Sequence, residues 1–366
     1  MNAVVKRVAI SSAHRTLVLS DIHGNLSFLK GLLDKVGFGA NDELFILGDI
    51  LEKSEFSLET LRFVMELSKK YAVHTLLGNC DNITLAFVDG RDGIPEAFFE
   101  HWFRTRKEKC ALVEMAGLLG LRADLPDGYP ALREAIREAF APELDFLRDL
   151  PHILLSDDYL FVHGGVPRED RLDELDAYGC MKNDNFLDQG RSFRRWVIVG
   201  HTPVTLYRAD IPSAKPLLDH DRHIASIDGG CVLKADGQLN ALILPQRPGG
   251  EFSYAAYDGL PVMTALEDQT PSEDPLNIRW GRSRVEVLDT GTEFCRCRHM
   301  ETGRELDILI EYLRWDEEGV YCEDSTDYRL PVTAGDRLSV ARQTSRGALC
   351  KKDGVTGWYF GRLIEA

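Results

Sequence analysis

The chain has 366 residues, of which 44% are hydrophobic, and its formal net charge is −16. This apolar content is enough for a sizeable core and argues against global disorder. The length fits one large domain with a smaller one. A strongly acidic chain repels nucleic-acid phosphate, so nucleic acid is not an expected partner.

The sequence shows no segment for a membrane or for export. No run approaches about 18 uninterrupted apolar residues, so no membrane partner is expected. The N-terminal stretch MNAVVKRVAISSAHRTLVLS lacks the long apolar core of a secretion signal. The eight cysteines are scattered along the chain. We therefore expect a cytoplasmic protein with reduced thiols.

The first 80 residues alternate between strand and helix patterns. Short apolar runs at 16–20, 44–48 and 73–77 end in turns rich in Gly, Asp or Asn, which is typical of buried strands. Between them, LSFLKGLLDKVG and SLETLRFVMELSKKYA carry apolar residues at three- and four-residue spacing, as amphipathic helices do. The alternation predicts βαβ units and an α/β fold.

Two further patterns follow. Residues about 83–150 read as a helical insertion, in which Phe98, Phe99, Trp102 and Phe103 form an aromatic stripe that we expect to be packing rather than a ligand site. After residue 150, apolar runs with tight turns predict a second sheet: YLFVHGG, WVIVGHTP, IASIDGGCVL and LNALILP.

The last part of the chain predicts a separate domain. Residues 266–276 are acidic and non-periodic and suggest a linker between a catalytic domain at 1–265 and a small all-β domain at 277–366. Short alternating strands there predict a barrel. It resembles an SH3-like barrel in strand number and in the ending GWYFGRL. Its aromatic residues either line a peptide groove for a protein partner or fill the core.

Potential metal ligands stand at the ends of the apolar runs. In α/β sheets, ligand sites gather beyond the carboxyl ends of strands, because the loops converge there. Oxygen and nitrogen donors in this position are enough for two divalent cations. The candidate ligands are Asp21, His23, Asp49, Asn79, His163 and His201.

The residue types suit a two-metal centre. Two neighbouring cations need a bridging ligand, and a carboxylate such as Asp49 has two oxygens for that role. Imidazoles and an amide carbonyl favour Mn, Fe or Zn over Mg or Ca. Such a metal pair lowers the pKa of a shared water and clamps phosphoryl oxygens for in-line attack.

The motifs SDIHGN, GDILEK, GNCDN, HGG and GHTP resemble those of the calcineurin-like metallophosphoesterases. Over residues 15–245 the chain is similar to the bacterial phosphoprotein-phosphatase branch. The resemblance implies a two-sheet sandwich flanked by helices and a metal-bridging hydroxide that attacks phosphorus. It places Asp21 and His23 on the first metal and Asp49 on both. It places Asn79, His163 and His201 on the second.

The chain departs from this family around the bridging aspartate. Where the family has an Asp and an Arg, and later a proton-donating His, this chain has Glu52, Lys53 and Cys80. Together with Asp81 these are the catalytic candidates. The family's second phosphate-binding Arg has no clear counterpart, and Lys182, Asn183 or a nearby arginine could replace it. The candidate substrate-binding residues are Asn25, Lys53, Asn79, Lys182 and Arg191.

Three functions fit these residues. The leading one is a phosphomonoesterase similar to phosphoprotein phosphatases, acting on a phosphorylated protein or small molecule. The second is a phosphodiesterase on a nucleotide-type substrate. The third is a metal-binding interaction protein with little catalysis.

Overall fold

The computed structural model describes residues 1–91, 93–247 and 249–366. Asp92, inside the expected helical insertion, and Pro248 lie outside the described residues. The chain divides into two compact units. The first consists of Met1–Thr202, Pro216–Leu233 and Gln238–Tyr257, and the second of Pro203–Lys215, Lys234–Gly237 and Asp258–Ala366.

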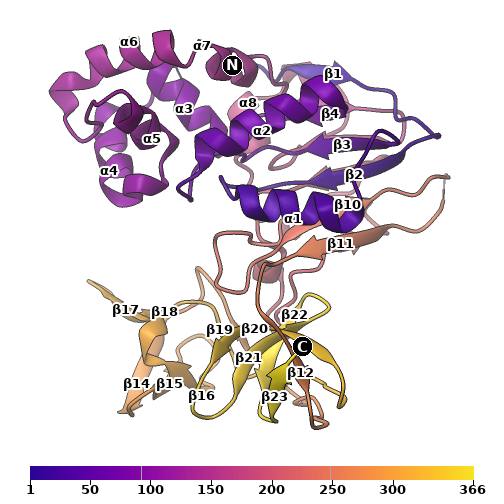
Figure 1. The fold of residues 1–366 in the computed structure, drawn as a ribbon, viewed down its shortest axis with the longest axis vertical. Coiled ribbons are helices and arrows are strands. Elements are labelled where there is room, and N and C mark those ends of the chain that lie inside the picture. The colour runs from indigo at the N-terminus through magenta and orange to yellow at the C-terminus, as the bar shows by residue number, and fades with distance from the viewer. Residues whose placement is uncertain (92, 248) are drawn as a thin grey trace. The chain divides into compact units, whose positions relative to one another are not determined.

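A five-stranded sheet forms one layer of the first unit. Its strand order is β11 (Ser253–Tyr257), β10 (Leu239–Ile243), β2 (Arg15–Leu19), β3 (Asp42–Ile46) and β4 (Ala72–Thr75). Strands β2, β3 and β4 run parallel, while β10 is antiparallel to β2. Helices α1 (Leu26–Val36) and α2 (Ser57–Lys70) connect the parallel strands and cover one face of the sheet (Figure 1). The predicted βαβ units are confirmed.

A six-stranded sheet forms the next layer and shares a core with the first. Its strand order is β1 (Val5–Arg7), β5 (Ile153–Leu155), β6 (Tyr159–Val162), β7 (Trp196–Val199), β9 (Ile224–Ser226) and β8 (Leu217–Asp219). The Phe45 ring from β3 stacks on the Phe161 ring from β6, with centroids 4.3 Å apart. Apolar residues of both sheets belong to one buried cluster. The two sheets are therefore packed as a sandwich.

One predicted strand lies in the other sheet. The run LNALILP forms β10, which belongs to the five-stranded sheet and not to the second one. The reason is antiparallel pairing: Leu242 lies opposite Val18 and Ile243 opposite Leu17. A short apolar strand fits either sheet by its pattern, so only the long-range pairing decides between them.

The helical insertion contains α3 (Asn79–Asp89), α4 (Glu96–Arg106), α5 (Ala111–Leu118), α6 (Tyr129–Ala139) and α7 (Ala141–Arg148), and α8 (Ala177–Met181) follows later. Phe99 and Phe103 are buried and make edge contacts with the Phe87 ring, as Tyr129 also does. This confirms the packing interpretation of the aromatic stripe. Trp102 stacks on Phe98 and also reaches a buried carboxylate described below.

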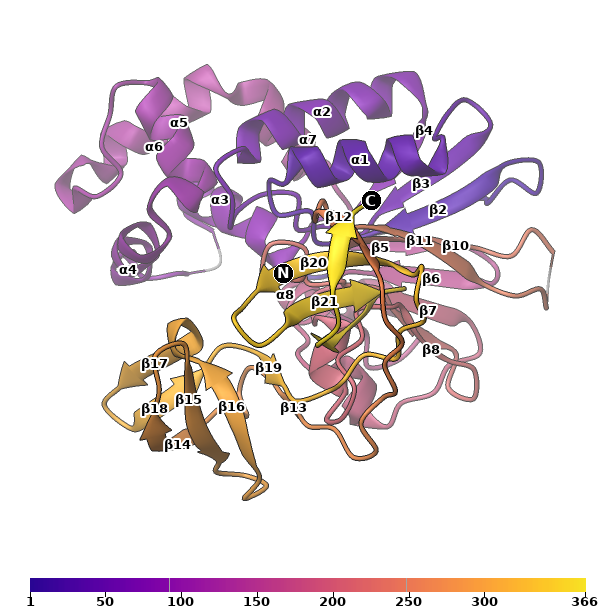
Figure 2. The ribbon, with the colours of Figure 1, turned by 60° about the horizontal axis from the view of Figure 1, so that its bottom comes forward.

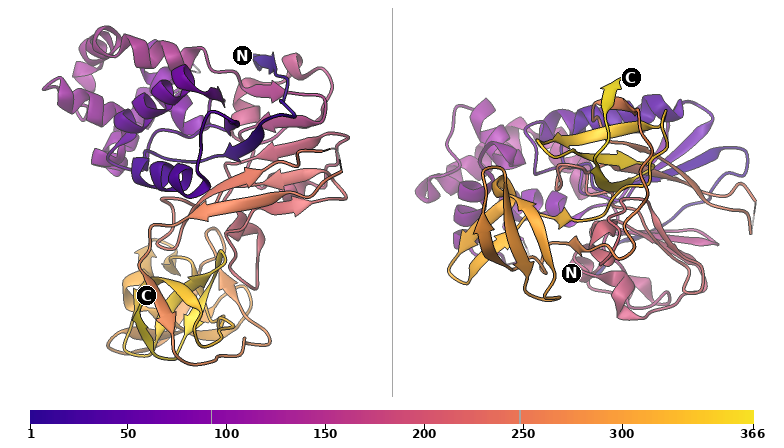
Figure 3. Two further views of the ribbon diagram at one scale, coloured as in Figure 1. Left: turned by 45° about the vertical axis from the view of Figure 1, so that its right-hand side comes forward. Right: turned by 90° about the horizontal axis from the view of Figure 1, so that it is seen from below.

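The second unit is all-β and consists of several small sheets (Figures 2 and 3). Its described residues form no closed barrel. Tyr359 is fully buried in its core, whereas Trp358 and Phe360 line a cavity of about 300 Å³. The strands are β12 (Val262–Ala265), β13 (Asn277–Ile278), β14 (Val285–Thr290), β15 (Phe294–His299), β16 (Glu305–Leu309), β17 (Leu313–Asp316), β18 (Gly319–Cys322), β19 (Ser325–Thr326), β20 (Arg337–Gln343), β21 (Ala348–Lys352), β22 (Val355–Tyr359) and β23 (Leu363–Glu365).

The division into units differs from the expected boundary at residue 265. Strand β12 pairs with β20 and β23, so the second unit begins before the expected linker. Two earlier segments also belong to the second unit. Lys234 forms a 2.9 Å ion pair with Asp324, and Asn277 donates to the Arg208 carbonyl at 2.8 Å. These contacts join residues that are far apart in sequence, which a search for linkers cannot detect.

Across the described residues, no helix has both the length and the apolar character needed to cross a membrane. All eight cysteines lie in the described parts of the chain, where they are buried and form no disulfide.

Candidate metal centre

The six expected metal ligands come from the ends of β2, β3, β6 and β7 and from the first residue of α3. The His23 Nε2 atom lies 3.7 Å from Oδ1 of Asp21 and 3.8 Å from Oδ2 of Asp49. On the other side of Asp49, the His163 Nε2 atom lies 3.5 Å from Oδ1 of Asp49 and 3.2 Å from Oδ1 of Asn79. The His201 ring centroid is 5.2 Å from that of His163. The structure thus brings all six residues together.

The backbone of this region is strained. Eleven non-glycine residues in the described chain have positive φ, and six of them lie here. Left-handed conformations of such residues cost about 1–3 kcal/mol each and tend to gather at functional sites. The six residues are Asp21, His23, Asp49, Glu52, Lys53 and His201. The fold therefore holds these loops in backbone conformations that position the candidate ligands, although each conformation lowers local stability.

Two glycines allow the loops to approach each other. A Cβ atom on Gly78 would lie 2.2 Å from Oδ1 of Asp49, and one on Gly200 would lie 2.4 Å from Oδ2 of Asp21. Both distances are far below van der Waals contact, so any larger residue would push these carboxylates out of place.

The donor atoms fit a pair of metal ions. Two groups of buried donors have all their ligand atoms within 4.8 Å of one another, and Asp49 belongs to both. The first group is His23, Asp49 and Cys80, and the second is Asp21, Asp49 and His163. A carboxylate shared by two donor groups is the arrangement that a bridging ligand requires. Buried carboxylates without cations are costly, so the donor set suits two positive ions.

The charges within the site also indicate a place for cations. The Lys53 Nζ atom lies 3.0 Å from Nε2 of His23 and brings an ammonium group to the buried carboxylates. Burial and the Lys53 charge lower the pKa of His23 to about 3, so this imidazole is neutral and can donate a lone pair. Burial and the nearby His163 likewise lower the pKa of His201 to about 4.

The pKa of His163 is shifted in the opposite direction from those of His23 and His201. Burial disfavours its charge, but the Asp49 and Asp21 carboxylates outweigh burial and raise its pKa to about 9. Its Nδ1 atom lies 2.7 Å from the Leu47 carbonyl, which fixes the ring with Nε2 facing Asp49. An N–H···O=C bond of this kind commonly orients histidines that bind metals.

Glu52 faces away from the other candidate catalytic groups. Its carboxylate accepts hydrogen bonds from the Trp102 indole at 3.1 Å and from the Ala111 amide at 3.0 Å. The Cys110 thiol lies 3.5 Å away as a third donor. Burial dominates and raises the pKa of Glu52 to about 7. These contacts give Glu52 the role of an anchor for the helical insertion.

The other candidate catalytic and substrate-binding residues lie in varied places. The Asp81 carboxylate is buried and accepts from the amides of Ile50 and Leu51, both at 2.9 Å, so it shapes the loop after β3. Asn25 caps α1 by accepting from the Phe28 amide. The Lys182 Nζ atom is 3.4 Å from Nε2 of His201.

Arg191 is the candidate whose contacts lie elsewhere. It donates to the carbonyl of Pro167 at 2.9 Å and to the side chain of Gln189 at 3.3 Å.

Two acidic residues of the site, Asp184 and Asp228, are not among the residues expected from the sequence. An oxygen of Asp184 lies 2.7 Å from Nε2 of His201. Asp228 is 1% exposed, and its Oδ2 atom is buried with no hydrogen-bond partner. Burial and the nearby Asp21 raise the pKa of Asp228 well above its usual value. Asp228 lies in the IDGG turn directly after an apolar run, so the strand-end pattern that identified the six ligands could also have identified Asp228.

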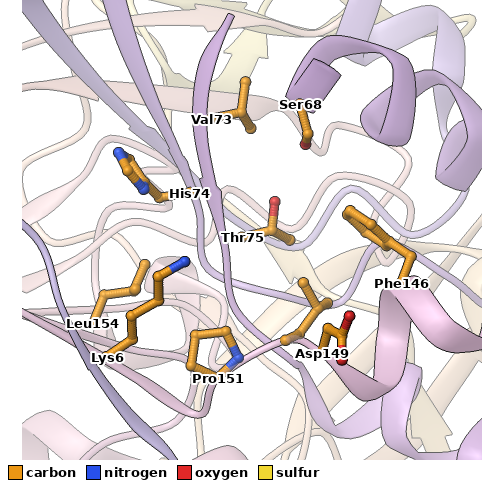
Figure 4. Close-up of a pocket in the computed structure, with 10 residues that line it drawn as sticks. Lys6, Ser68, Val73, His74, Thr75, Phe146, Asp149, Pro151 and Leu154 are labelled. Atoms are coloured by element: carbon orange, nitrogen blue, oxygen red, sulfur yellow. The ribbon is translucent and has the colours of Figure 1, made fainter.

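A cavity of about 210 Å³ lies elsewhere in the first unit, beside β4 (Figure 4). The side chains of Lys6 and Thr75 point toward its middle, and the His74 ring points away. His74 instead pairs with Glu43 at 2.9 Å. None of the expected metal, catalytic or substrate-binding residues lines this cavity.

The sandwich fold and the buried donor groups define a metal-dependent phosphoester hydrolase. Residues 14–225 match the calcineurin-like phosphoesterase family, so the chain belongs to that family. Its members depend on two metal ions, and this chain carries matching donor groups.

The relatives include enzymes named for dinucleoside tetraphosphates. The chain is 26% identical over 254 residues to the bis(5'-nucleosyl)-tetraphosphatase PrpE [asymmetrical] of Bacillus velezensis, covering 63% of this chain and 88% of the relative. It is 35% identical over 103 residues to the symmetrical bis(5'-nucleosyl)-tetraphosphatase of Haemophilus ducreyi, covering 24% of this chain and 37% of that one. A solved metallophosphoesterase from Sphaerobacter thermophilus has 16% identity and a TM-score of 0.36, covering 67% of this chain and 88% of that chain.

Proposed function

We propose that this enzyme hydrolyses a nucleotide-type substrate at a phosphorus atom with two substituents, as in a bis(5'-nucleosyl) tetraphosphate. One observation carries the proposal: neither residue of the expected proton-donating pair is suited to protonate a leaving group. Glu52 is bound by Trp102 and Ala111, and Cys80 is buried, with burial raising the pKa of its thiol well above the usual value. The names of the relatives agree with such a substrate.

The leaving group explains the preference. An alkoxide such as that of serine needs a proton as it departs, and general acid catalysis is typically worth about 10²–10⁴-fold. A nucleotide phosphate departs as a stable anion and needs little help. A site without a strong general acid therefore acts on anhydrides far better than on alkyl esters.

The six ligand residues have distinct roles in this proposal. Asp21 and His23 would hold the first metal, Asn79, His163 and His201 would hold the second, and Asp49 would contribute an oxygen to each. When bound, the metal pair supplies an activated water and stabilises the charge that develops on phosphoryl oxygens. Lys53, next to His23, and Lys182, next to His201, bring cations to either side of the site and bind further phosphate oxygens.

A phosphomonoesterase of the phosphoprotein-phosphatase-like branch is the second candidate. The two lysines favour it, because a terminal phosphate carries two negative charges and gains more from paired cations. The two candidates differ in whether an alkyl phosphomonoester is a good substrate.

The test compares substrates on the full chain loaded with manganese. We expect kcat/KM for bis(5'-adenosyl) tetraphosphate to exceed that for phosphoserine by about 10²-fold or more. Rates for p-nitrophenyl phosphate and for bis(p-nitrophenyl) phosphate compare a monoester with a diester that has the same leaving group. The Asp49→Ala variant provides the background rate. A phosphoserine rate equal to the tetraphosphate rate would reject the nucleotide proposal in favour of the monoesterase.

A further inference from the structure

We propose that Cys80 is a sulfur ligand of the metal ion held by His23 and Asp49. This inference rests on the two-metal site proposed above. It gives the ion at His23 a mixed donor set of nitrogen, oxygen and sulfur. The residues assigned above to the other ion, Asn79, His163 and His201, offer only oxygen and nitrogen.

The first argument is the arrangement of donor atoms. The sulfur of Cys80, a ring nitrogen of His23 and a carboxylate oxygen of Asp49 all lie within 4.8 Å of one another. Zinc binds sulfur at about 2.3 Å and nitrogen at about 2.0–2.1 Å. In a tetrahedral site these bonds place the sulfur and the nitrogen about 3.6 Å apart. Side-chain movements of about 1 Å therefore bring the three donors around one ion.

The second argument is that the backbone holds Cys80 against the bridging carboxylate. Cys80 is the second residue of α3, and its amide donates to Oδ1 of Asp49 at 2.8 Å. The tight contact between Gly78 and Asp49 fixes the start of the helix. Asn79, one residue earlier, lies 3.2 Å from His163. The first turn of α3 therefore provides two donors, Cys80 on the His23 side of Asp49 and Asn79 on the His163 side.

The third argument is burial. Cys80 is 2% exposed and His23 is fully buried. Water therefore cannot easily complete the ion's coordination on this side, and the thiol is the donor at hand. When the thiol binds a cation its proton leaves for the solvent, so metal uptake through Cys80 releases one proton.

A sulfur ligand changes which metals the site prefers. Thiolates favour zinc and iron, whereas carboxylates, carbonyls and water suit manganese and magnesium. We therefore expect the ion at His23, Asp49 and Cys80 to be zinc or iron when several metals compete.

The test is X-ray absorption at the zinc edge of the full chain loaded with zinc. We expect a sulfur shell at about 2.3 Å with about half a sulfur per zinc, since one thiolate is averaged over two ions. In Cys80→Ser this shell disappears and only nitrogen and oxygen near about 2.0–2.1 Å remain. A chelator competition should show zinc affinity at least about 10-fold weaker in that variant.

The matched control is Cys231→Ser. The Cys231 sulfur lies 3.7 Å from Nδ2 of Asn25, near the same loops, but belongs to neither donor group. It should keep the sulfur shell. Zinc bound by nitrogen and oxygen alone in the native protein would overturn the inference, as would loss of the shell in Cys231→Ser. Failure of the native chain to bind two ions would instead count against the two-metal site itself.

Discussion

Asp49 is the residue on which both donor groups depend. The native chain should bind close to two metal ions, and Asp49→Ala should lose most of both, because each group loses its shared carboxylate. Elemental analysis after loading with manganese measures this directly. Asp145→Asn is the control, since Asp145 is an exposed carboxylate on α7 that belongs to neither donor group. Full metal retention by Asp49→Ala would contradict the bridging role.

Glu52 should make stability depend on pH. Burial raises its folded pKa from 4.5 to about 7, so the folded chain holds this proton more tightly than the unfolded chain. The resulting stabilisation is complete below about pH 4.5 and is lost as the pH rises through about 7. At 1.36 kcal/mol per pKa unit the loss is about 3 kcal/mol.

The Glu52→Gln variant lacks this titration. Urea unfolding at about pH 5 and about pH 8, at equal metal content, should show the native free energy of unfolding falling by about 3 kcal/mol more than that of the variant. Parallel pH profiles for the two proteins would show that Glu52 does not titrate in this range.

At the scale of elements, the helical insertion is tied to the loop after β3. Trp102 from α4 and Ala111 from α5 bind the Glu52 carboxylate. The Lys53 amide donates to the Lys109 carbonyl at 2.8 Å. The insertion therefore helps to hold Glu52 and Lys53 in their left-handed conformations.

Trp102→Phe tests this tie. The phenyl ring keeps an aromatic contact with Phe98, but the buried carboxylate loses a donor. At about pH 8, above the raised Glu52 pKa of about 7, we expect a loss of about 1.5–3 kcal/mol in the free energy of unfolding, as for hydrogen bonds to charged groups. Trp315, which is 65% exposed, gives the control Trp315→Phe, with a change within about 0.5 kcal/mol. Equal effects of both substitutions would exclude the tie.

At the scale of the whole molecule, a chain ending at Ala265 tests the domain boundary. It keeps Lys234 and its neighbour Asp236, at 3.8 Å, but removes Asp324, the nearer acidic partner of this buried lysine at 2.9 Å. Breaking a buried ion pair costs about 3–5 kcal/mol, so we expect a lower melting temperature by calorimetry. Asp324→Ala in the full chain isolates the contribution of this pair. An unchanged melting temperature of the shortened chain would instead support the boundary expected from the sequence.

Local patterns in the sequence were enough to predict the α/β class, the helices and the position of the six candidate ligands at strand ends. These features are local: an apolar run predicts a strand, and the polar residue after it lies at the strand's end. Because the carboxyl ends of parallel strands meet at one edge, the strand pattern alone was enough to group Asp21 with Asp49.

The meeting of segments far apart in the chain became visible in the folded structure alone. It placed β10 beside β2, turned Glu52 toward Trp102 and Ala111, and joined Lys234 to Asp324. It also brought the Cys80 sulfur to His23 and Asp49. The shortest of these separations, between Asp49 and Cys80, is 31 positions. Side-chain direction and long-range pairing depend on packing from the whole chain, and local sequence patterns do not encode that packing.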